Sequence, residues 1–284
     1  MVEFKYERVS ERITRIYGIS GEFWYLVTGD EKAALLDTGS GIGHMKPLID
    51  NLTDKPLIIL LTHGHVDHAN GAPEFDCPIY MNPADNPIYE MHKGIVVRNE
   101  GLEMTPAEIR DKLEESDYIP VRKQPFLPLQ HGDTFELGGL TVECYSCAGH
   151  TPGSMVFLLR EERTVLLGDA CNYFTFLFFD YCLSIETYRK NLLTLKGQLG
   201  GKFDRVLLSH GDGAAPTAIL DGVIGVCDDI LRGNTDDVPF IFRGEKCHVA
   251  KAMTGPGMRR DGGIGNIVYN KSNIWATPRN AETE

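Results

Sequence analysis

Three histidines and one aspartate lie within six residues, directly after an apolar run. The run, Leu57–Leu61, is typical of a strand that is buried on both faces. It is followed by Thr62-His63-Gly64-His65-Val66-Asp67-His68. Imidazole nitrogens and carboxylate oxygens are the usual ligands of zinc and related divalent ions, and a strand end can hold such a loop rigidly. The first two histidines lie on one side of an extended segment, whereas the aspartate and the third histidine lie where the chain turns. The spacing therefore favours two adjacent metal sites over one.

Three further polar residues follow apolar strands later in the chain. His150 lies in a turn between two predicted strands, Asp169 closes the run Val165–Gly168, and His210 follows Val206–Ser209. Taken singly, each is more often a capped turn or a structural histidine than a ligand. Because strand ends can aim such side chains at one point, we expect all three to be metal ligands beside the first motif.

Apolar periodicity predicts a single α/β domain over residues 1–284. Short strands, an amphipathic helix starting near Met45 and the buried strand fill the first sixty residues. Strands return between residues 140 and 167, Ser184 begins a second long helix, and another helix spans roughly residues 217–231.

Two segments depart from this alternation. Residues 82–124 carry helix-start patterns, including the capping box Thr105-Pro-Ala-Glu108, which predicts a helix ending near Ser116. We interpret 82–124 as a helical insertion, either a lid or a surface excursion with no role in the chemistry. Residues 235–284 form a C-terminal extension with short strands at 239–242 and 266–269 around a glycine-rich loop.

The composition excludes several classes of protein. Apolar residues make up 42% of the 284 residues, which is too many for a disordered chain. The 28 basic and 40 acidic residues give a net charge of −12, which opposes a nucleic-acid partner. No apolar run reaches the ~18 residues of a membrane span, and the N-terminus has no signal-peptide core, so we expect no membrane partner. Seven cysteines, an odd number in a chain that needs no disulfides, favour a reduced cytoplasmic protein.

Together these motifs resemble those of the metallo-β-lactamase superfamily. The resemblance rests on His63-x-His-x-Asp-His68, on His150, Asp169 and His210, and on Asp37-Thr-Gly39 upstream. Within the superfamily, Thr-His-x-His-x-Asp-His-x-x-Gly with Gly-His-Thr-Pro-Gly-Ser is similar to the glyoxalase II and lactonase-like hydrolases. The similarity spans about residues 20–213.

The resemblance implies an αββα sandwich with the metals at one edge of its two sheets, to which the insertion and the extension are added. It implies one metal held by His63, His65 and His150, and another held by Asp67, His68 and His210. Asp169 would bridge them, and Asp37 would orient the ligand loop.

The same resemblance implies a hydrolytic chemistry. Two metals about 3.5–4 Å apart can share a hydroxide that attacks a substrate carbonyl, while one metal polarises the carbonyl oxygen and the other steadies the leaving group. We expect two divalent ions, zinc in the first place and iron or manganese as alternatives. Asp67 could receive the proton. Lactonases of the superfamily place a tyrosine just beyond the bridging aspartate, so Tyr173 is the candidate for the carbonyl oxygen. Tyr181 is the second choice, and a structural role for Tyr173 is an equal alternative.

The expected substrate is a small molecule with a thioester or lactone-like carbonyl. Residues 241–284 hold seven basic and four acidic residues, a balance of +3 against −15 for the rest, so an anionic substrate is conceivable. The loop Gly255–Gly263 could cradle such an anion or be simply solvated. The phenylalanines of segment 174–179 could line a pocket or pack in the core. A mononuclear-iron sulfur dioxygenase and a small-nucleotide phosphodiesterase are the alternative functions, and an oligomer is compatible with the sequence.

Overall fold

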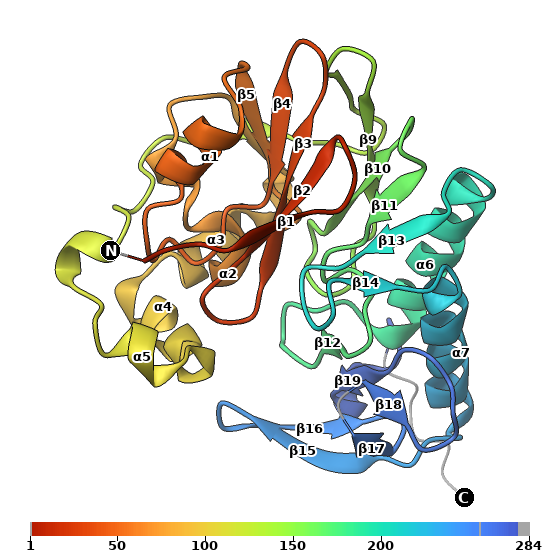
Figure 1. Cartoon of the computed structure of the whole chain (residues 1–284). Coiled ribbons are helices and arrows are strands. Elements are labelled where there is room, and N and C mark those ends of the chain that lie inside the picture. The colour runs from red at the N-terminus through yellow and green to blue at the C-terminus, as the bar shows by residue number, and fades with distance from the viewer. Residues whose placement is uncertain (1, 256, 278–284) are drawn as a thin grey trace, which may run out of the picture.

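Two β-sheets pack face to face, and helices cover the outer face of each (Figure 1). This computed structural model describes residues 2–255 and 257–277. The apolar side chains between the sheets form one cluster, and each outer face packs in a cluster of its own. The predicted αββα sandwich is therefore confirmed.

The first sheet has seven strands from the N-terminal half of the chain, and they lie side by side in chain order. They are β1 (Tyr6–Arg8), β2 (Ile13–Tyr17), β3 (Phe23–Thr28), β4 (Ala33–Leu36), β5 (Leu57–Leu60), β6 (Ile79–Met81) and β7 (Leu127–Pro128). β1 to β4 pair antiparallel, whereas β4 to β7 pair parallel. Because parallel neighbours need a crossover, helix α1 (Lys46–Leu52) lies between β4 and β5 on the outer face.

The second sheet has six strands in the order β14-β13-β11-β10-β9-β8. They are β8 (Thr134–Glu136), β9 (Thr141–Ser146), β10 (Met155–Leu159), β11 (Thr164–Leu166), β13 (Arg205–Leu207) and β14 (Ala214–Ala215). Helices α6 (Ile185–Leu199) and α7 (Ile219–Arg232) cover its outer face. Within the described residues, no helix is long and apolar enough to cross a membrane.

Strand periodicity explains the layers. In β3, Tyr25 and Val27 face the inter-sheet cluster, while Trp24 and Leu26 face the outer cluster under α1. β10 divides its side chains between two clusters in the same way. Each central strand is thus apolar on both faces and has a continuous apolar sequence.

Local signals set the ends of the two long helices. The Ser184 hydroxyl accepts a hydrogen bond from the backbone N–H of Thr187 at 3.2 Å, the cap predicted for α6. α7 ends at Gly233, whose φ of +72° permits the left-handed turn that closes many helices.

The segment 82–124 is built of short helical turns. After α2 (Val66–Ala69) and the 3-10 turn Ala72–Glu74, the chain forms 3-10 turns at Pro83–Asp85, Leu102–Met104 and Glu115–Asp117 and the helices α3 (Asn86–His92), α4 (Ile95–Gly101) and α5 (Ala107–Arg110). The helix predicted from Thr105 to near Ser116 is wrong in length, because α5 is a single turn. The Thr105 hydroxyl does not cap it but bonds the Ser20 hydroxyl at 2.9 Å.

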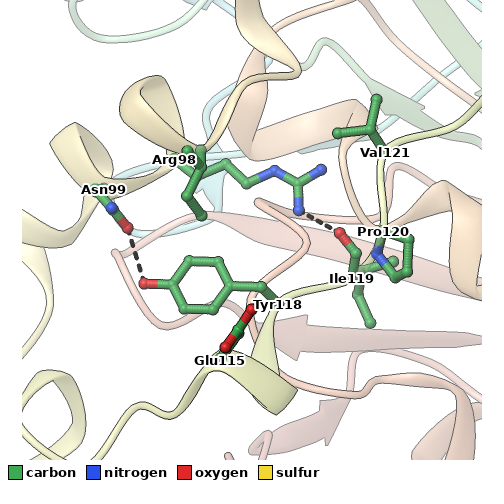
Figure 2. Close-up of a pocket in the computed structure, with 8 residues that line it drawn as sticks. Arg98, Asn99, Glu115, Tyr118, Ile119, Pro120 and Val121 are labelled. Atoms are coloured by element: carbon green, nitrogen blue, oxygen red, sulfur yellow. Dashed lines mark hydrogen bonds between the residues drawn. The ribbon is translucent and has the colours of Figure 1, made fainter.

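The guanidinium of Arg98 bonds both the body, at Gly41, and another part of the insertion, at Ile119. It donates to the carbonyl oxygens of Gly41 and Ile119, at 3.3 Å and 2.5 Å, and Figure 2 shows the second of these bonds. A hollow of about 480 Å³ lies between α4 and residues 115–121, and it includes none of the predicted metal ligands.

A third sheet joins the segment after Asp169 to the C-terminal extension. Its strands, in the order β12-β19-β16-β15, are β12 (Thr175–Leu177), β19 (Ile267–Tyr269), β16 (Glu245–Val249) and β15 (Val238–Phe242). β17 (Met253–Gly255) and β18 (Met258–Arg259) form a separate pair, and a 3-10 turn follows at Lys271–Asn273. The hairpin β15–β16 extends toward the insertion in Figure 1. The phenylalanines of segment 174–179 pack against this sheet.

Candidate metal centre

The seven predicted ligands come from both main sheets and lie together at one edge of the sandwich. They are His63 and His65 after β5, Asp67 and His68 on α2, His150 between β9 and β10, Asp169 after β11 and His210 after β13. Their donor atoms form three overlapping groups, within each of which all atoms lie within 4.8 Å of one another: His63-His65-His150, His63-His68-Asp169 and Asp67-His68-His210.

Three imidazole nitrogens face one another in the first group. His65 Nδ1 lies 3.0 Å from His63 Nε2 and 3.0 Å from His150 Nε2. On its outer side His150 donates its Nδ1–H to the carbonyl oxygen of Phe176 at 2.8 Å, which leaves the lone pair of Nε2 pointing at the group. A cation between the rings would satisfy all three nitrogens together.

The group of Asp67, His68 and His210, together with Asp169, alternates imidazole nitrogens with carboxylate oxygens. His210 Nε2 lies 3.2 Å from an oxygen of Asp67 and 3.2 Å from an oxygen of Asp169. His68 Nε2 lies 3.5 Å from the same two oxygens, and it is buried without a hydrogen-bond partner among the described residues. A buried ring nitrogen without a partner, beside two carboxylates, fits a divalent cation.

Asp169 connects the two groups. Its Oδ2 lies 3.2 Å from His210 Nε2 and 3.8 Å from His150 Nε2, so one carboxylate faces both sets of ligands. This placement fits two neighbouring ions with Asp169 between them.

Asp37 orients the ligands from behind. It follows β4 with a φ of +66° and is 1% exposed. Its carboxylate accepts hydrogen bonds from the backbone N–H of Thr62 at 2.7 Å, from the Thr62 hydroxyl at 2.8 Å and from His68 Nδ1 at 2.8 Å. The last bond turns His68 Nε2 toward the metal groups, which is the role that the resemblance implies for Asp37.

Burial and neighbouring charges shift the pKa values of the ligands in different directions. Burial and the neighbouring imidazoles hold the pKa of His63 well below its usual value, so its ring is neutral. Burial alone would raise the pKa of Asp67, but His68 and His210 outweigh it and keep the carboxylate ionised. Burial lowers the pKa of His210, whereas Asp169 and Asp67 raise it to about 10 overall. A metal at this site therefore competes with a proton on His210.

Asp85 is a site residue that the sequence analysis missed. Its buried carboxylate accepts from the backbone N–H of Gly64 at 2.8 Å, from the Thr151 hydroxyl at 2.7 Å and from the backbone N–H of Gly153 at 2.6 Å. It thereby ties the loop of the first two histidines to the turn that carries His150. Its sequence context, Asn82-Pro-Ala-Asp85, indicates only a helix start.

Tyr181, not Tyr173, contacts a predicted ligand. The Tyr181 hydroxyl lies 2.8 Å from His65 Nε2, on the outer side of that ring. Tyr173 packs against the cluster under α6 and α7, and none of the hydrogen bonds among the described residues joins it to a ligand. The contact with His65 supports Tyr181, the second choice, and the catalytic role of either tyrosine stays a prediction.

Of the two arginines in the glycine-rich loop, Arg259 is engaged within the loop itself. Arg259 pairs with Asp261 and donates to the carbonyl oxygen of Gly265 at 3.1 Å. Its guanidinium therefore braces its own loop, whereas Arg260 is exposed, and an anion cradle in this loop stays a prediction. Arg279 of the extension lies outside the described residues.

Comparison with known proteins identifies the family. The model of the metallo-β-lactamase superfamily matches residues 17–210. An uncharacterised protein of Mycobacterium tuberculosis H37Rv is 32% identical over 152 residues, which are 48% of this chain and 61% of that protein. An atrochrysone carboxyl ACP thioesterase of Aspergillus novofumigatus is 28% identical over 174 residues, which are 57% of this chain and 44% of that protein. The matches thus span less than two thirds of the length of either relative.

Solved structures agree in fold. The metallo-β-lactamase FIM-1 of Pseudomonas aeruginosa, in its mono-zinc form, superposes with a TM-score of 0.59 at 14% identity, over 81% of this chain and 96% of that one. The sec-alkyl sulfatase PisA1 gives a TM-score of 0.61 at 13% identity, over 80% of this chain and 42% of that one. Since the family model covers most of the chain and the sandwich carries its ligands at the expected edge, this protein belongs to the metallo-β-lactamase superfamily, whose members are largely metal-dependent hydrolases.

Proposed function

We propose that this protein is a dimetal hydrolase that cleaves the thioester or lactone-like carbonyl of a small molecule. The observation that carries the proposal is the pair of ligand groups that share the Asp169 carboxylate. Two divalent ions, which we propose to be zinc, would supply Lewis acidity and an activated water when bound. The side chains then have to hold the ions, orient the carbonyl and manage protons.

Tyr181 is placed to orient the carbonyl. Burial raises the pKa of its hydroxyl, so the group keeps its proton. The oxygen can accept a hydrogen bond from His65 Nε2–H, at 2.8 Å, and still donate its own proton to a substrate carbonyl oxygen. This donor would stabilise negative charge that develops on that oxygen during attack.

The named relatives favour a thioester over other acyl groups. The matching proteins of Aspergillus novofumigatus and of a Cryptosporiopsis species are both named atrochrysone carboxyl ACP thioesterases, at 28% and 27% identity. The charge of −12 supports a small substrate in preference to a nucleic acid.

A substrate panel tests the proposal. The metal-loaded protein is assayed with thioesters, lactones, β-lactams and bis(p-nitrophenyl) phosphate, with Asp169→Asn as the inactive control. We expect hydrolysis of thioesters or lactones, and a loss of about 10³-fold or more in kcat for Asp169→Asn because the two ligand groups are no longer joined by an anion.

Two results would reverse this order of functions. Release of nitrophenol from the phosphodiester without thioester hydrolysis would favour a phosphodiesterase. A single bound iron, together with oxygen uptake on a persulfide substrate, would favour a sulfur dioxygenase. Metal analysis of the purified protein distinguishes the last case directly, since the proposal requires about two ions per chain.

A further inference from the structure

A row of aromatic rings leads from the metal ligands to the hairpin β15–β16. Tyr181, which bonds His65, stacks on Phe179 with ring centroids 5.2 Å apart. Phe179 in turn lies 6.4 Å from the ring of Phe242, the last residue of β15. All these contacts are between neighbouring rings, so an apolar wall connects the ligand loop with the hairpin turn.

Arg243 lies at the outer end of this wall. Its guanidinium carbon is 5.2 Å from the ring centroid of Phe242, and its Nη1 is 3.6 Å from a carboxylate oxygen of Glu100 on α4. The two side chains are 34% and 49% exposed, so water screens the pair and holds it weakly. An anionic group of a substrate could displace Glu100 at little cost.

Three other cations of the extension are engaged elsewhere. Lys251 pairs with Asp229 at 2.7 Å, Lys271 pairs with Asp237 at 2.8 Å, and Arg259 braces its own loop. These pairs lie within the extension or against α7, so they do not offer a positive charge to the aromatic wall.

The backbone at Arg243 is also unusual. Arg243 and Gly244 have φ values of +47° and +87° and form the two-residue turn between the paired Phe242 and Glu245. Such turns favour asparagine, aspartate or glycine at the first position, because other side chains are strained there. A long cation in a strained turn at the end of a wall to the active site is a feature that stability does not explain.

Resting on the proposed function, we propose that Arg243 positions substrates that carry an anionic group, a carboxylate or a phosphate, at the far end of an apolar or aromatic stretch. The reacting carbonyl would lie at Tyr181, the apolar stretch along Phe179 and Phe242, and the anion at Arg243 in place of Glu100.

Matched substrates and variants test this assignment. The metal-loaded full chain hydrolyses a neutral acyl thioester of N-acetylcysteamine and its ω-carboxylate counterpart, in a series of increasing acyl length. Arg243→Asn removes the cation and suits the turn, so it should fold. We expect it to raise KM for the anionic ester about tenfold, with kcat unchanged, and to leave KM for the neutral ester within about twofold.

Three further variants complete the set. Arg243→Lys keeps the charge and should restore most of the preference for the anionic ester. Glu100→Gln removes the competing carboxylate and should lower KM for the anionic ester or leave it unchanged. Lys246→Asn makes the same charge change on the same hairpin, at a side chain on the opposite face from buried Cys247, and should change neither KM.

A second arm identifies the source of the anion. A neutral acyl group on phosphopantetheine carries its phosphate on the thiol side, whereas the ω-carboxylate lies on the acyl side. The ester whose KM rises in Arg243→Asn shows whether an anion on the thiol side or on the acyl side of the substrate reaches Arg243. An equal change in KM for neutral and anionic esters, or no change for either anionic ester, would overturn the assignment.

Binding measurements separate this inference from the proposed function. Calorimetric Kd values for non-hydrolysable thioether analogues, with and without the anionic group, require no turnover. If no ester of the panel is hydrolysed, the proposed function fails, and a weaker Kd of Arg243→Asn for the anionic analogue alone would still support the anion subsite. If esters are hydrolysed but that Kd is unchanged, the subsite fails and the function stands.

Discussion

Two buried aspartates outside the ligand set govern where the ligands lie. Asp85 links Gly64, between the first two histidines, to Thr151, beside His150. Asp37 links Thr62 to His68. Each carboxylate accepts hydrogen bonds from separate parts of the chain, so it fixes the distance between ligands that belong to different loops. Metal affinity should therefore depend on residues that do not touch the metal.

We expect Asp85→Asn and Asp37→Asn to lower the affinity of the protein for different metal ions. At either position an asparagine replaces one accepting oxygen by an N–H₂ group. Because this group faces N–H or O–H donors, at least one hydrogen bond is lost. Asp85→Asn should lower the affinity for the ion at His63, His65 and His150 by about 10–100-fold. Asp37→Asn should lower the affinity for the ion at His68 by a similar factor. Stepwise titration against a chromogenic chelator measures both constants. Equal weakening of both ions by each variant would contradict this division.

Glu22 should make the stability of the metal-free protein depend on pH. It is 1% exposed, and burial, followed by the negative charge of Asp67, raises its pKa from 4.5 to about 7. Because the unfolded chain loses this proton first, stability should fall as the pH rises between these two values.

Glu22→Gln should remove that dependence and stabilise the metal-free protein above pH 7 by about 3 kcal/mol. Urea unfolding of wild type and variant at about pH 5 and about pH 8 measures the effect. This role of Glu22 would be refuted if the free energy of unfolding of the variant, relative to wild type, were no higher at about pH 8 than at about pH 5.

Among the elements, α4 connects the insertion to the ligand-bearing part of the fold. It packs against α2, which carries Asp67 and His68, and Arg98 donates a hydrogen bond to Gly41 in the loop that follows Asp37. A second bond of Arg98, to Ile119, lies within the insertion (Figure 2). The insertion is thus attached near the predicted metal ligands. It also supplies His92, whose ring lies 6.3 Å from that of Tyr181, and Glu100, which pairs with Arg243.

Arg98→Met should destabilise the fold by about 2–3 kcal/mol, because two carbonyl oxygens lose their donor while the side chain keeps its length. Urea unfolding measures this loss, and Arg110→Met on exposed α5 is the matched control, with an expected change below about 0.5 kcal/mol. Equal effects of the two variants would show that the buried guanidinium does not hold the insertion.

Elements whose signals are local could be predicted, and those that depend on distant partners could not. Ser184 caps α6 as predicted because its acceptor function lies within one turn. Thr105 has the same kind of signal, but its hydroxyl bonds Ser20, far away in the sequence. β16 escaped prediction because Glu245–Val249 has few apolar residues and pairs with β15 and β19 across the extension.

The molecule as a whole brings seven ligands together from loops of two sheets. The short motif after β5 was sufficient to predict where the metal centre begins, and the strand-end rule extended it to His150, Asp169 and His210. The bonds of Asp85 and the contact of Tyr181 with His65 could not be predicted. Both depend on which loops meet in space, and no spacing along the chain encodes that.

Metal binding by the intact protein should release protons. His210 has a pKa of about 10, so it is protonated near neutral pH until a metal displaces the proton. Calorimetric titration at about pH 8 in buffers of different ionisation enthalpy should show about one proton or more released per chain, and fewer for His210→Gln. A binding enthalpy that is independent of the buffer would contradict this linkage.

The distance along the chain between ligands determines when during folding the metals can bind tightly. His63 and His65 are completed by His150, and Asp67 and His68 by His210, so each ion needs both sheets to be docked. The unfolded chain presents only the short motif. A cross-link from residue 63 to residue 210 would also cost the unfolded chain about 5 kcal/mol in loop entropy. The ions should therefore bind tightly only after the main barrier to folding has been crossed. They should slow unfolding and leave the folding rate nearly unchanged.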